Sequence, residues 1–499
     1  MTRHDGQRSQ QRTRRLGRAL AALTALCALA ACSSPDLGSS HFACSSDADC
    51  SDGEVCGSVG VERACVATSD SPIRIGMSGP FQGPSAELGI EMRRGISALF
   101  QSVNESGGIY GRDLELLAEN DNYDPDAAVE AVSSLLDIQE STPGPDEPDV
   151  RGPNGVFALL GSIGTPTMLR TAPLANKNQV VFFAPFTGAQ TYLRDGTNSP
   201  YVYNYRAGYF EETQAMIDYL STSRLPRVIS QPPGDSYRRI IVFQQDDSYG
   251  DSGYDGVVNA YQRVPEASLP AADSISRIRY QREQLASVDQ PIEEAKVLLD
   301  TLHQEANGPV SVAIVMIDTY EPANRFIRGV KNWIYADATR AAQLDVLFMN
   351  VSFVGSDSLS DALRATPELA TGSASYTDNV MVMQVVPYYG SQAEAIVSYR
   401  RDIDRFEVGD YTFTSLEGYI VAKLFSDALK LNGPNLTTDS FRAVLDNQIR
   451  DMDIGIGTAL SFSTQNRQAS HTVWGSQIEP DGSFSVPFIW NPTARIQSN

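Results

Sequence analysis

The chain has 499 residues, of which 42% are hydrophobic and 20% are charged, and its formal net charge is −22. This length is enough for two or three domains with cores of their own. So acidic a chain argues against binding to nucleic acid and against electrostatic adsorption to anionic lipid.

Residues 1–31 are predicted to be a lipoprotein signal peptide. Six arginines and one acid precede an apolar run from Ala19 to Ala31 that is too short to span a bilayer stably. The run ends in Leu29-Ala30-Ala31-Cys32, which resembles a bacterial lipobox, so we expect cleavage before Cys32 and lipidation of that cysteine. Ordinary signal-peptidase cleavage beside an incidental cysteine is the alternative. Removing these residues takes the net charge to −27, so we expect the lipid alone to attach the protein to the cell envelope. The protein would face the periplasm or the cell surface.

The segment after the signal contains a cluster of cysteines. Residues 32–43 read as a polar tether, and residues 44–66 hold Cys44, Cys50, Cys56 and Cys65. Four clustered cysteines in an exported chain predict two disulfides and hence a small disulfide-rich module. A zinc site is the alternative, but the usual C-x₂₋₄-C spacing is absent and no histidine lies inside the cluster.

From residue 73 onward, short apolar strands alternate with helical periodicities. Helices are expected over 88–103, 126–138 and 255–261, and another opens at Thr165. Such β-α repeats predict parallel sheets covered by helices on both faces, and more than ten units indicate two lobes. Two stretches rich in Pro, Gly and Asp, 141–155 and 224–237, read as surface insertions. The expected strands are 73–77, 114–117, 156–160, 180–183, 240–243, 312–316, 346–349 and 380–383.

The turns after these strands are the expected ligand sites, because ligands bind beyond the carboxyl ends of parallel strands. The turn Gly161–Thr167 contains Ser162 and Thr165 at the start of a helix, where free N–H groups and hydroxyls favour an anion. The alternative is that Thr165 only caps the helix, with Pro166 at its first position. Ala184–Ala189 is a second such turn. Tyr249, Tyr320 and Phe353 follow later strands, and core packing is their alternative role.

Enzyme signatures are lacking, and we expect no catalytic residue, cofactor or metal. The four histidines have no neighbour at metal-ligand spacing, and neither a phosphate-binding G-x-x-x-x-G-K-[ST] loop nor a G-x-S-x-G turn occurs. No cysteine follows Cys65. Asp246 and Asp247 read as a turn and a helix N-cap.

Six motifs stand in the order found in one known family. They resemble the opening strand, the N-x-x-G-G-I-x-G-R hairpin, the D-x-x-x-D-P turn and three ligand turns of type I periplasmic binding proteins of the leucine/isoleucine/valine-binding branch. The resemblance covers about residues 73–490. The motifs are Ile73–Pro80, Asn104–Arg112, Asn120–Pro125, Gly161–Thr167, Ala184–Ala189 and Asp247–Gly250.

The resemblance implies an α/β fold of two Rossmann-like lobes that close on a solute like a Venus flytrap. Lobe I would comprise 72–204 plus 388–450, and lobe II 205–387 plus 451–495. Three crossing strands would join them, near 201–206, 380–387 and 453–457. Carried over to this chain, the residues contacting the ligand would be Ser162, Thr165, Phe186, Thr187 and Gly188 from one lobe and Tyr249, Thr319, Tyr320 and Ser352 from the other.

One position departs from the family pattern. Its amino-acid binders place an acid after the strand that matches 346–349, where it pairs with the ligand's ammonium, but this chain has Ser352 there. A buried ammonium without a counter-ion is costly. The pattern therefore allows an amino acid or a related small carboxylate or amide.

The resemblance implies the solute-capture component of an ABC importer, with a membrane permease as partner and no nucleic acid. A ligand sensor that signals to a membrane partner is the alternative, because the cysteine-rich module is unusual for importers. An adhesion protein whose trap has lost its ligand is a third possibility.

Overall fold

The computed structural model describes residues 54–59, 62–67, 72–144, 147–190, 193–220, 240–263, 275–305, 309–365, 369 and 374–498. The chain divides into two compact units, residues 1–70 and 71–499. In the first unit, β1 (Glu54–Val59) and β2 (Glu62–Ala67) form an antiparallel pair whose register sets Cys56 opposite Cys65. The residues Cys32, Cys44 and Cys50, expected to carry lipid or to form bridges, lie outside the described residues.

The first sheet of the second unit has five parallel strands in the order β4-β3-β7-β8-β9. Every residue of β7 and β8 is buried, as expected for parallel strands covered on both faces. The strands are β3 (Ile73–Gly79), β4 (Leu114–Asn120), β7 (Ala158–Leu160), β8 (Val181–Phe183) and β9 (Val202–Tyr203).

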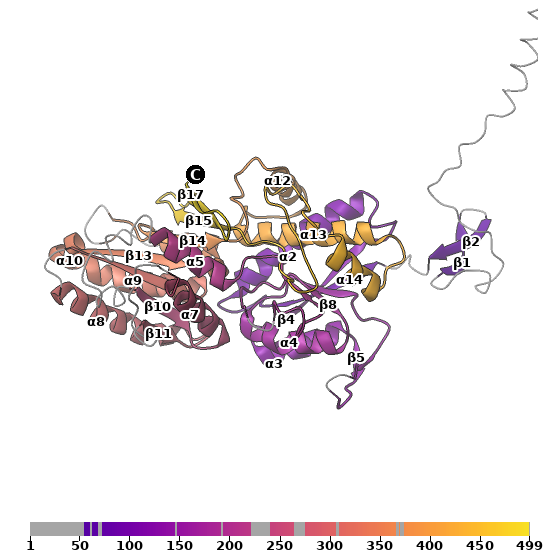
Figure 1. Cartoon of the computed structure of the whole chain (residues 1–499), viewed down its shortest axis with the longest axis horizontal. Helices are drawn as coiled ribbons and strands as arrows, with labels where there is room; N and C mark the ends of the chain where they lie inside the picture. Colours follow the sequence, from indigo (N-terminus) through magenta and orange to yellow (C-terminus); the bar gives the residue numbers. More distant parts are fainter. Residues whose placement is uncertain are drawn as a thin grey trace, which may run out of the picture. The chain divides into compact units, whose positions relative to one another are not determined.

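Helices from two distant parts of the chain belong to this sheet, and we call the whole assembly lobe I. Figure 1 shows α13 (Phe413–Asn432), from late in the chain, beside α2 (Ala86–Glu105). The two helices cross so closely that a Cβ on Gly95 would lie 1.8 Å from the carbonyl oxygen of Ser415. The other helices of lobe I are α3 (Pro125–Leu135), α4 (Thr165–Lys177), α12 (Glu394–Phe406) and α14 (Thr438–Asn447).

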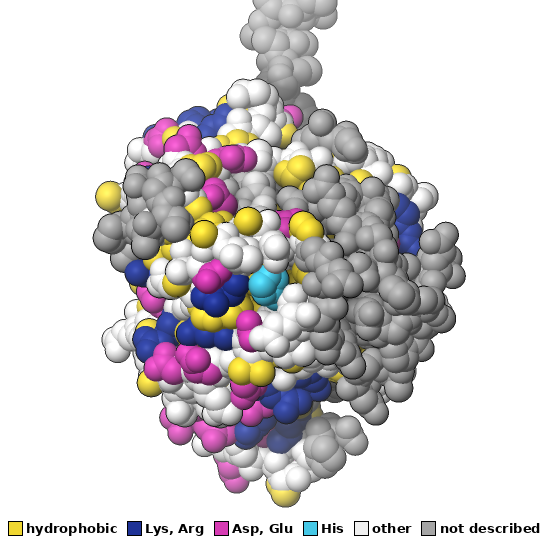
Figure 2. Space-filling view, turned by 90° about the vertical axis from the view of Figure 1, so that its left-hand side faces the viewer, with side chains coloured by type: hydrophobic (Ala, Val, Ile, Leu, Met, Phe, Trp, Pro, Cys, Tyr) yellow, Lys and Arg dark blue, Asp and Glu magenta, His cyan; other side chains and the backbone are white. Residues whose placement is uncertain are grey.

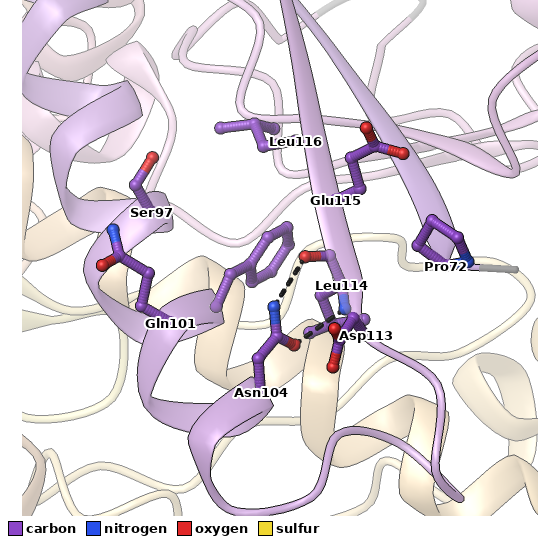
Figure 3. Close-up of a pocket in the computed structure, with 9 residues that line it drawn as sticks. Pro72, Ser97, Gln101, Asn104, Asp113, Leu114, Glu115 and Leu116 are labelled. Carbon is purple, nitrogen blue, oxygen red and sulfur yellow. Dashed lines mark hydrogen bonds between the residues drawn. The ribbon is translucent and has the colours of Figure 1, made fainter. Parts of the chain in front are cut away.

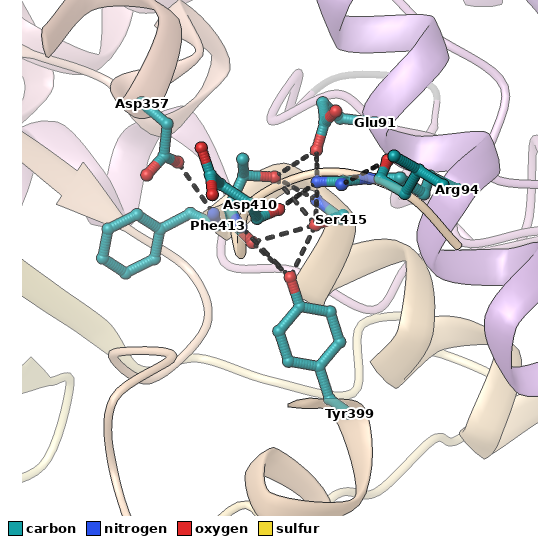
Figure 4. A network of polar contacts seen from close by, with 9 residues as sticks. Glu91, Arg94, Asp357, Tyr399, Asp410, Phe413 and Ser415 are labelled. Atoms are coloured by element: carbon teal, nitrogen blue, oxygen red, sulfur yellow. Dashed lines mark hydrogen bonds and ion pairs between the residues drawn. The ribbon is translucent and has the colours of Figure 1, made fainter. Parts of the chain in front are cut away.

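A polar network fastens α2 to the start of α13 (Figure 4). The guanidinium of Arg94 pairs with Glu91 and donates to the backbone carbonyl of Asp410. The hydroxyl of Thr412 donates to Glu91 at 2.6 Å, and as the N-cap of α13 it accepts the N–H of Ser415 at 3.0 Å. These bonds satisfy polar groups that burial between two helices would otherwise leave unpaired.

The second sheet has eight strands in the order β11-β10-β12-β13-β14-β15-β16-β17, and we call it and its helices lobe II. Its strands are β10 (Ile240–Gln245), β11 (Ser276–Tyr280), β12 (Val310–Ile317), β13 (Leu344–Asn350), β14 (Val380–Gln384), β15 (Val473–Ile478), β16 (Phe484–Asn491) and β17 (Arg495–Ser498). Its helices are α5 (Tyr209–Tyr219), α7 (Ser248–Tyr261), η5 (Leu285–Val288), α8 (Asp289–Glu305), α9 (Tyr320–Tyr335), α10 (Ala338–Gln343), η6 (Ser352–Val354) and α11 (Ser356–Arg364).

Repeated β-α units predict parallel pairing, and the strands expected in the second sheet pair with one another in parallel. The antiparallel end of this sheet is made by β15, β16 and β17, which the sequence analysis does not predict. Strands β11 to β14 pair in parallel, but β14 to β17 pair antiparallel. For β15 and β16 the reason is local, because these strands are joined by a short turn in which Gly482 has a φ of +91°. Such a hairpin connection can join only antiparallel strands.

The helix expected over 126–138 is also shorter than the sequence predicts. It ends at Leu135, and the next residues form β5 (Ile138–Glu140), which pairs antiparallel with β6 (Val150–Arg151). The insertion expected over 141–155 is therefore closed by a short pair of strands.

The chain passes between the two sheets three times, after β9, after β14 and before β15. The third passage was expected near 453–457. That segment instead turns back on itself, with Met452 bridged to Leu460 and positive φ angles at its glycines. Residues 467–470 form the passage, and the N–H of Ala469 donates to the carbonyl of Asn204 in the first passage at 2.9 Å.

Few large apolar side chains are exposed in the described part of the chain. Figure 2 shows one face on which acidic and basic side chains lie interspersed. Within the described ranges, no helix combines the length and apolarity needed to cross a bilayer. The exposed large apolar side chains are scattered, which is ordinary for a protein surface; they are Tyr110, Val150, Val297, Val397, Val408 and Leu431.

Candidate functional site

Two threonine hydroxyls meet at the start of α4. Thr165 is the first residue of this helix, and its Oγ1 lies 2.6 Å from Oγ1 of Thr187, which follows β8. The N-cap is Gly164, with a φ of +106° and no side-chain cap bond, so the interpretation of Thr165 as a cap is wrong. Because its hydroxyl does not satisfy the helix end, it is available to the site, beside the positive end of the helix.

Aromatic side chains cover this hydroxyl pair. The hydroxyl of Tyr209 lies 3.4 Å from Oγ1 of Thr165, and the Tyr209 ring centroid is 5.4 Å from that of Tyr249. The ring of Tyr249 is 4.7 Å from Phe353, which in turn is 5.3 Å from Phe186. All these side chains are buried, and we call this group of residues the interlobe cluster. It comprises Thr165, Phe186 and Thr187 from lobe I and Tyr209, Tyr249 and Phe353 from lobe II.

Gly188 allows the two lobes to approach at this cluster. A Cβ at this position would lie 2.3 Å from Cδ1 of Tyr209, and the Gly188 carbonyl accepts the N–H of Tyr209 at 2.7 Å. Any larger residue would displace the ring that covers the threonine pair.

Ser162 lies outside the interlobe cluster. Its hydroxyl oxygen accepts the N–H of Ser78 at 3.0 Å, and the Ser78 hydroxyl donates to Asp121 at 2.6 Å. Burial raises the pKa of Asp121 to about 6, and its bonds to Ser78 and to the backbone oppose that rise. These contacts give Ser162 a structural role within lobe I.

The turn after β12 holds two further expected residues at the lobe boundary. Thr319 is the N-cap of α9, and Tyr320 is its first residue; both are buried. The hydroxyl of Tyr249 donates to the backbone carbonyl of Asp318 at 2.9 Å, which ties this turn to the interlobe cluster. Tyr320 lies near Glu87 of α2 in lobe I. Burial raises the pKa of Tyr320 to about 12, and the charge of Glu87 adds to this rise.

Ser352 lies in a buried charge cluster that the sequence did not reveal. The Ser352 N–H donates to Glu212 Oε2 at 2.6 Å, and its hydroxyl contacts the guanidinium of Arg206. Arg206 covers the ring of Phe186 at 4.4 Å, and its Nε is 3.6 Å from Glu417 Oε1. We call Arg206, Glu212, Ser352 and Glu417 the charge cluster.

Burial controls the acids of the charge cluster. It raises the pKa of Glu212 to about 7, although Arg206 and the Ser352 N–H oppose the rise. Burial also raises the pKa of Glu417 against the same arginine. When both acids are ionised, the charge cluster holds two negative charges and one positive charge, so its net charge is about −1.

Asp318, also missed by the sequence, is the most isolated acid in this region. It is fully buried at the end of β12, and neither carboxylate oxygen has a hydrogen-bond partner among the described residues. Burial raises its pKa well above the usual range. In the sequence, nothing marks Asp318 except its position between a strand and a helix N-cap.

A surface depression of about 420 Å³ lies elsewhere, beside α2 and the start of β4 (Figure 3). Its polar groups already have structural partners, because the Asn104 amide donates to the carbonyl of Leu114 at 3.0 Å and accepts the Leu114 N–H at 2.8 Å. These bonds close the turn before β4, so this depression is a weaker candidate site than the interlobe cluster.

The two sheets, their three connecting passages and a polar site buried between lobes define a two-lobed solute-binding protein. The periplasmic binding protein family model matches residues 72–264. The crystal structure of a possible leucine/isoleucine/valine-binding protein from Rhodopirellula baltica SH 1 is 30% identical, with a TM-score of 0.65, and the match covers 84% of this chain and 98% of that chain. The chain belongs to the type I periplasmic binding protein family, as its motifs predict.

More distant relatives agree with this assignment. Leu/Ile/Val-binding protein homolog 7 of Brucella abortus (strain 2308) is 24% identical over 195 residues, 39% of this chain and 44% of that protein. The chain thus spans less than half the length of the curated relatives it matches. A branched chain amino acid ABC transporter protein from Thermus thermophilus, solved with bound valine, is 11% identical with a TM-score of 0.63, over 86% of this chain and 97% of that chain, and shows the fold alone.

Proposed function

We propose that this protein is an exported, lipid-anchored solute-binding protein of an ABC-type importer. It captures an amino acid, or a related small carboxylate or amide, between its lobes. The observation that carries the proposal is the buried pair of hydroxyls of Thr165 and Thr187 at a helix N-terminus, covered by aromatic rings from the other lobe.

The chemistry of this pair suits a carboxylate. Two hydroxyls and the free N–H groups of the first turn of α4 supply donors, and the helix dipole favours negative charge. The rings of Tyr209, Tyr249 and Phe353 supply an apolar surface for the rest of a small solute. Because these groups come from both lobes, a bound solute would hold the lobes together.

The names of similar proteins support the same class of ligand. Relatives are named as Leu/Ile/Val-binding proteins, and a structural neighbour holds valine. The family and these neighbours are solute-binding proteins rather than enzymes. That this chain also binds a branched-chain amino acid is part of the proposal.

A thermal-shift screen tests the proposal directly. The purified protein, from residue 33 onward, is screened against amino acids, the same acids without their amine, and amides, and hits are measured by calorimetry. We expect at least one compound to raise the melting temperature and to bind with micromolar or better affinity. If no compound in the panel binds, the proposed function is wrong.

The anchor and the transport role need cellular tests. Cys32→Ala should abolish labelling of the protein by a radioactive fatty acid. The variant should also be absent from the membrane fraction that detergent extracts. Deletion of the gene should slow uptake of the ligand found in the screen, and a copy carrying Thr165→Ala should fail to restore it. Normal uptake in the deletion strain would favour the sensor over the importer.

A further inference from the structure

The carboxylate of Asp318 is a buried charge for which the described part of the protein offers no partner. Asp318 is 0% exposed, and both Oδ1 and Oδ2 lack a hydrogen bond within the described residues. An ionised carboxylate buried without hydrogen bonds or a cation is strongly unfavourable. An acid in this position is therefore kept neutral by a proton or is balanced by a cation that comes from outside the chain.

Asp318 lies beside the position of the missing family acid. In the parallel register of β12 and β13, Met316 is opposite Asn350, and Asp318 and Ser352 each come two residues after this pair. Tyr249 contacts both turns, because its hydroxyl donates to the Asp318 carbonyl and its ring lies 4.7 Å from Phe353. Asp318 thus stands at the carboxyl edge of the sheet, where ligands of such folds bind.

The surroundings of Asp318 are aromatic. Gln245 ends β10, between the neighbouring strands β11 and β12. It is opposite Tyr280 in β11. Because Gln244 is opposite Ile317 in β12, Gln245 lies next to Asp318 on that side. After burial, the charge of Asp318 is the largest cause that raises the pKa of Tyr280, and it also raises that of Tyr249. An acid beside electron-rich rings suits an organic cation, which both groups attract.

Arg206 of the charge cluster makes no ion pair or hydrogen bond with Asp318 among the described contacts, although its Nε and Nη1 lack hydrogen-bond partners there. The guanidinium of Arg206 contacts Ser352, pairs with Glu417 and covers Phe186. Within the charge cluster, the guanidinium of Arg206 faces two acids, Glu212 and Glu417, rather than Asp318.

We propose that Asp318 binds a cationic nitrogen of the ligand, in place of the acid that Ser352 replaces. The inference rests on the proposed function and narrows it. The ligand would carry both a carboxylate, held at Thr165 and Thr187, and an ammonium, held at Asp318. This favours α-amino acids and their N-alkylated forms over simple carboxylates and amides. In the unliganded protein a proton neutralises Asp318, and that proton leaves as the ammonium arrives, so each ligand bound at neutral pH releases about one proton.

The test compares Asp318→Asn with the wild-type protein on matched probes. The probes are the amino acids of the thermal-shift panel and the same molecules without the amine, for example leucine and 4-methylpentanoate. Asp318→Asn should lower the affinity for the amino acid by about ten- to hundredfold and should leave the affinity for the amine-free compound within about threefold of wild type. Asp246→Asn is the control, because Asp246 is an exposed acid just beyond the neighbouring strand β10, and it should bind both probes like wild type.

A second measurement guards against misfolding of the variant. Calorimetry of wild-type protein in buffers of different ionisation enthalpy should show about one proton released per amino acid bound and none for the amine-free compound. Three outcomes would overturn the role of Asp318 while leaving solute capture intact. The wild-type protein could bind only amine-free compounds, the Asp318→Asn variant could bind amino acids normally, or binding could occur without proton release. A wild-type protein that binds no panel compound overturns the proposed function, and this inference with it.

Discussion

Asp357 Oδ2 accepts the backbone N–H of Phe413 at 2.8 Å, so a carboxylate of α11 in lobe II meets the first residue of α13 in lobe I (Figure 4). The positive end of α13 favours the ionised form of this acid. Burial and the charges of Glu91 and Asp361 outweigh that effect and raise the pKa of Asp357 to about 7. Asp357 is therefore a contact between lobes whose charge changes near neutral pH.

Asp357→Asn should alter the pH dependence of stability. An acid whose pKa is higher in the folded protein binds its proton more tightly there, so its contribution to stability falls as pH rises from about 4 to about 7. The variant should therefore melt at a higher temperature than wild type at pH 8 and at nearly the same temperature at pH 4.5. Thermal unfolding across this range checks it, with Asp246→Asn, at an exposed acid that does not act on the pKa of Asp357, as the control. A variant less stable than wild type at pH 8 would show that the bond to Phe413 needs the charge.

Thr165→Ala should weaken ligand binding without destabilising the helix. The loss of one hydroxyl donor to a buried carboxylate costs about 1–3 kcal/mol, or about five- to hundredfold in affinity. Because Gly164 rather than Thr165 is the N-cap, the helix keeps its cap, and the melting temperature of the unliganded protein should fall only by the effect of the lost bond to Thr187. Thr165→Ser keeps the hydroxyl and should bind like wild type. Tyr249→Ala should weaken binding from the other lobe. Wild-type affinity in both alanine variants would place the site elsewhere.

Gly188→Ala should be harmful although alanine is small. Its Cβ would lie 2.3 Å from Tyr209, and relief of such overpacking costs about 1–3 kcal/mol. We expect a lower melting temperature and loss of binding. Tyr209→Ala removes the obstructing ring, so in the double variant the stability loss caused by Gly188→Ala should be much smaller than in the single variant. Additive losses measured by chemical unfolding would contradict the proposed clash.

The cysteine-rich unit should be fully oxidised, with a defined connectivity. Opposite residues of an antiparallel pair lie within disulfide range, and the register sets Cys56 opposite Cys65, which leaves Cys44 to pair with Cys50. Peptide mapping by mass spectrometry without reduction should find these two bridges. Free thiols, or zinc bound in stoichiometric amount, would favour the metal alternative. Deleting residues 40–70 should leave the melting temperature of residues 71–499 nearly unchanged, because that unit has its own core.

The sequence predicts most of the parallel strands and the turns at their carboxyl ends, because those signals are local. The apolar run 180–183 gives β8, and Asp247 caps α7 by accepting the N–H of Tyr249, as its position predicts. The strand-turn-helix pattern also locates Thr165, although not the partner of its hydroxyl.

The charged part of the site could not be predicted in this way. Glu212 and Glu417 lie in helices, where acids are usually solvated, and they meet Arg206 only because the chain crosses between the lobes. Asp318 reads as an ordinary residue before a helix cap. What sets these groups apart is burial without adequate partners, a property of the assembled core that no short pattern records.

The packing of α13 on α2 has a consequence for the order in which the protein is made. Bonds such as that between Thr412 and Glu91 join residues 321 positions apart, and the helix that covers the first lobe is among the last parts of the chain to be synthesised. An amino-terminal fragment therefore exposes the apolar face that α13 later buries and has no complete lobe to form. A nascent chain of this design cannot complete lobe I until α13 has been made, which suits a protein that is exported before it folds.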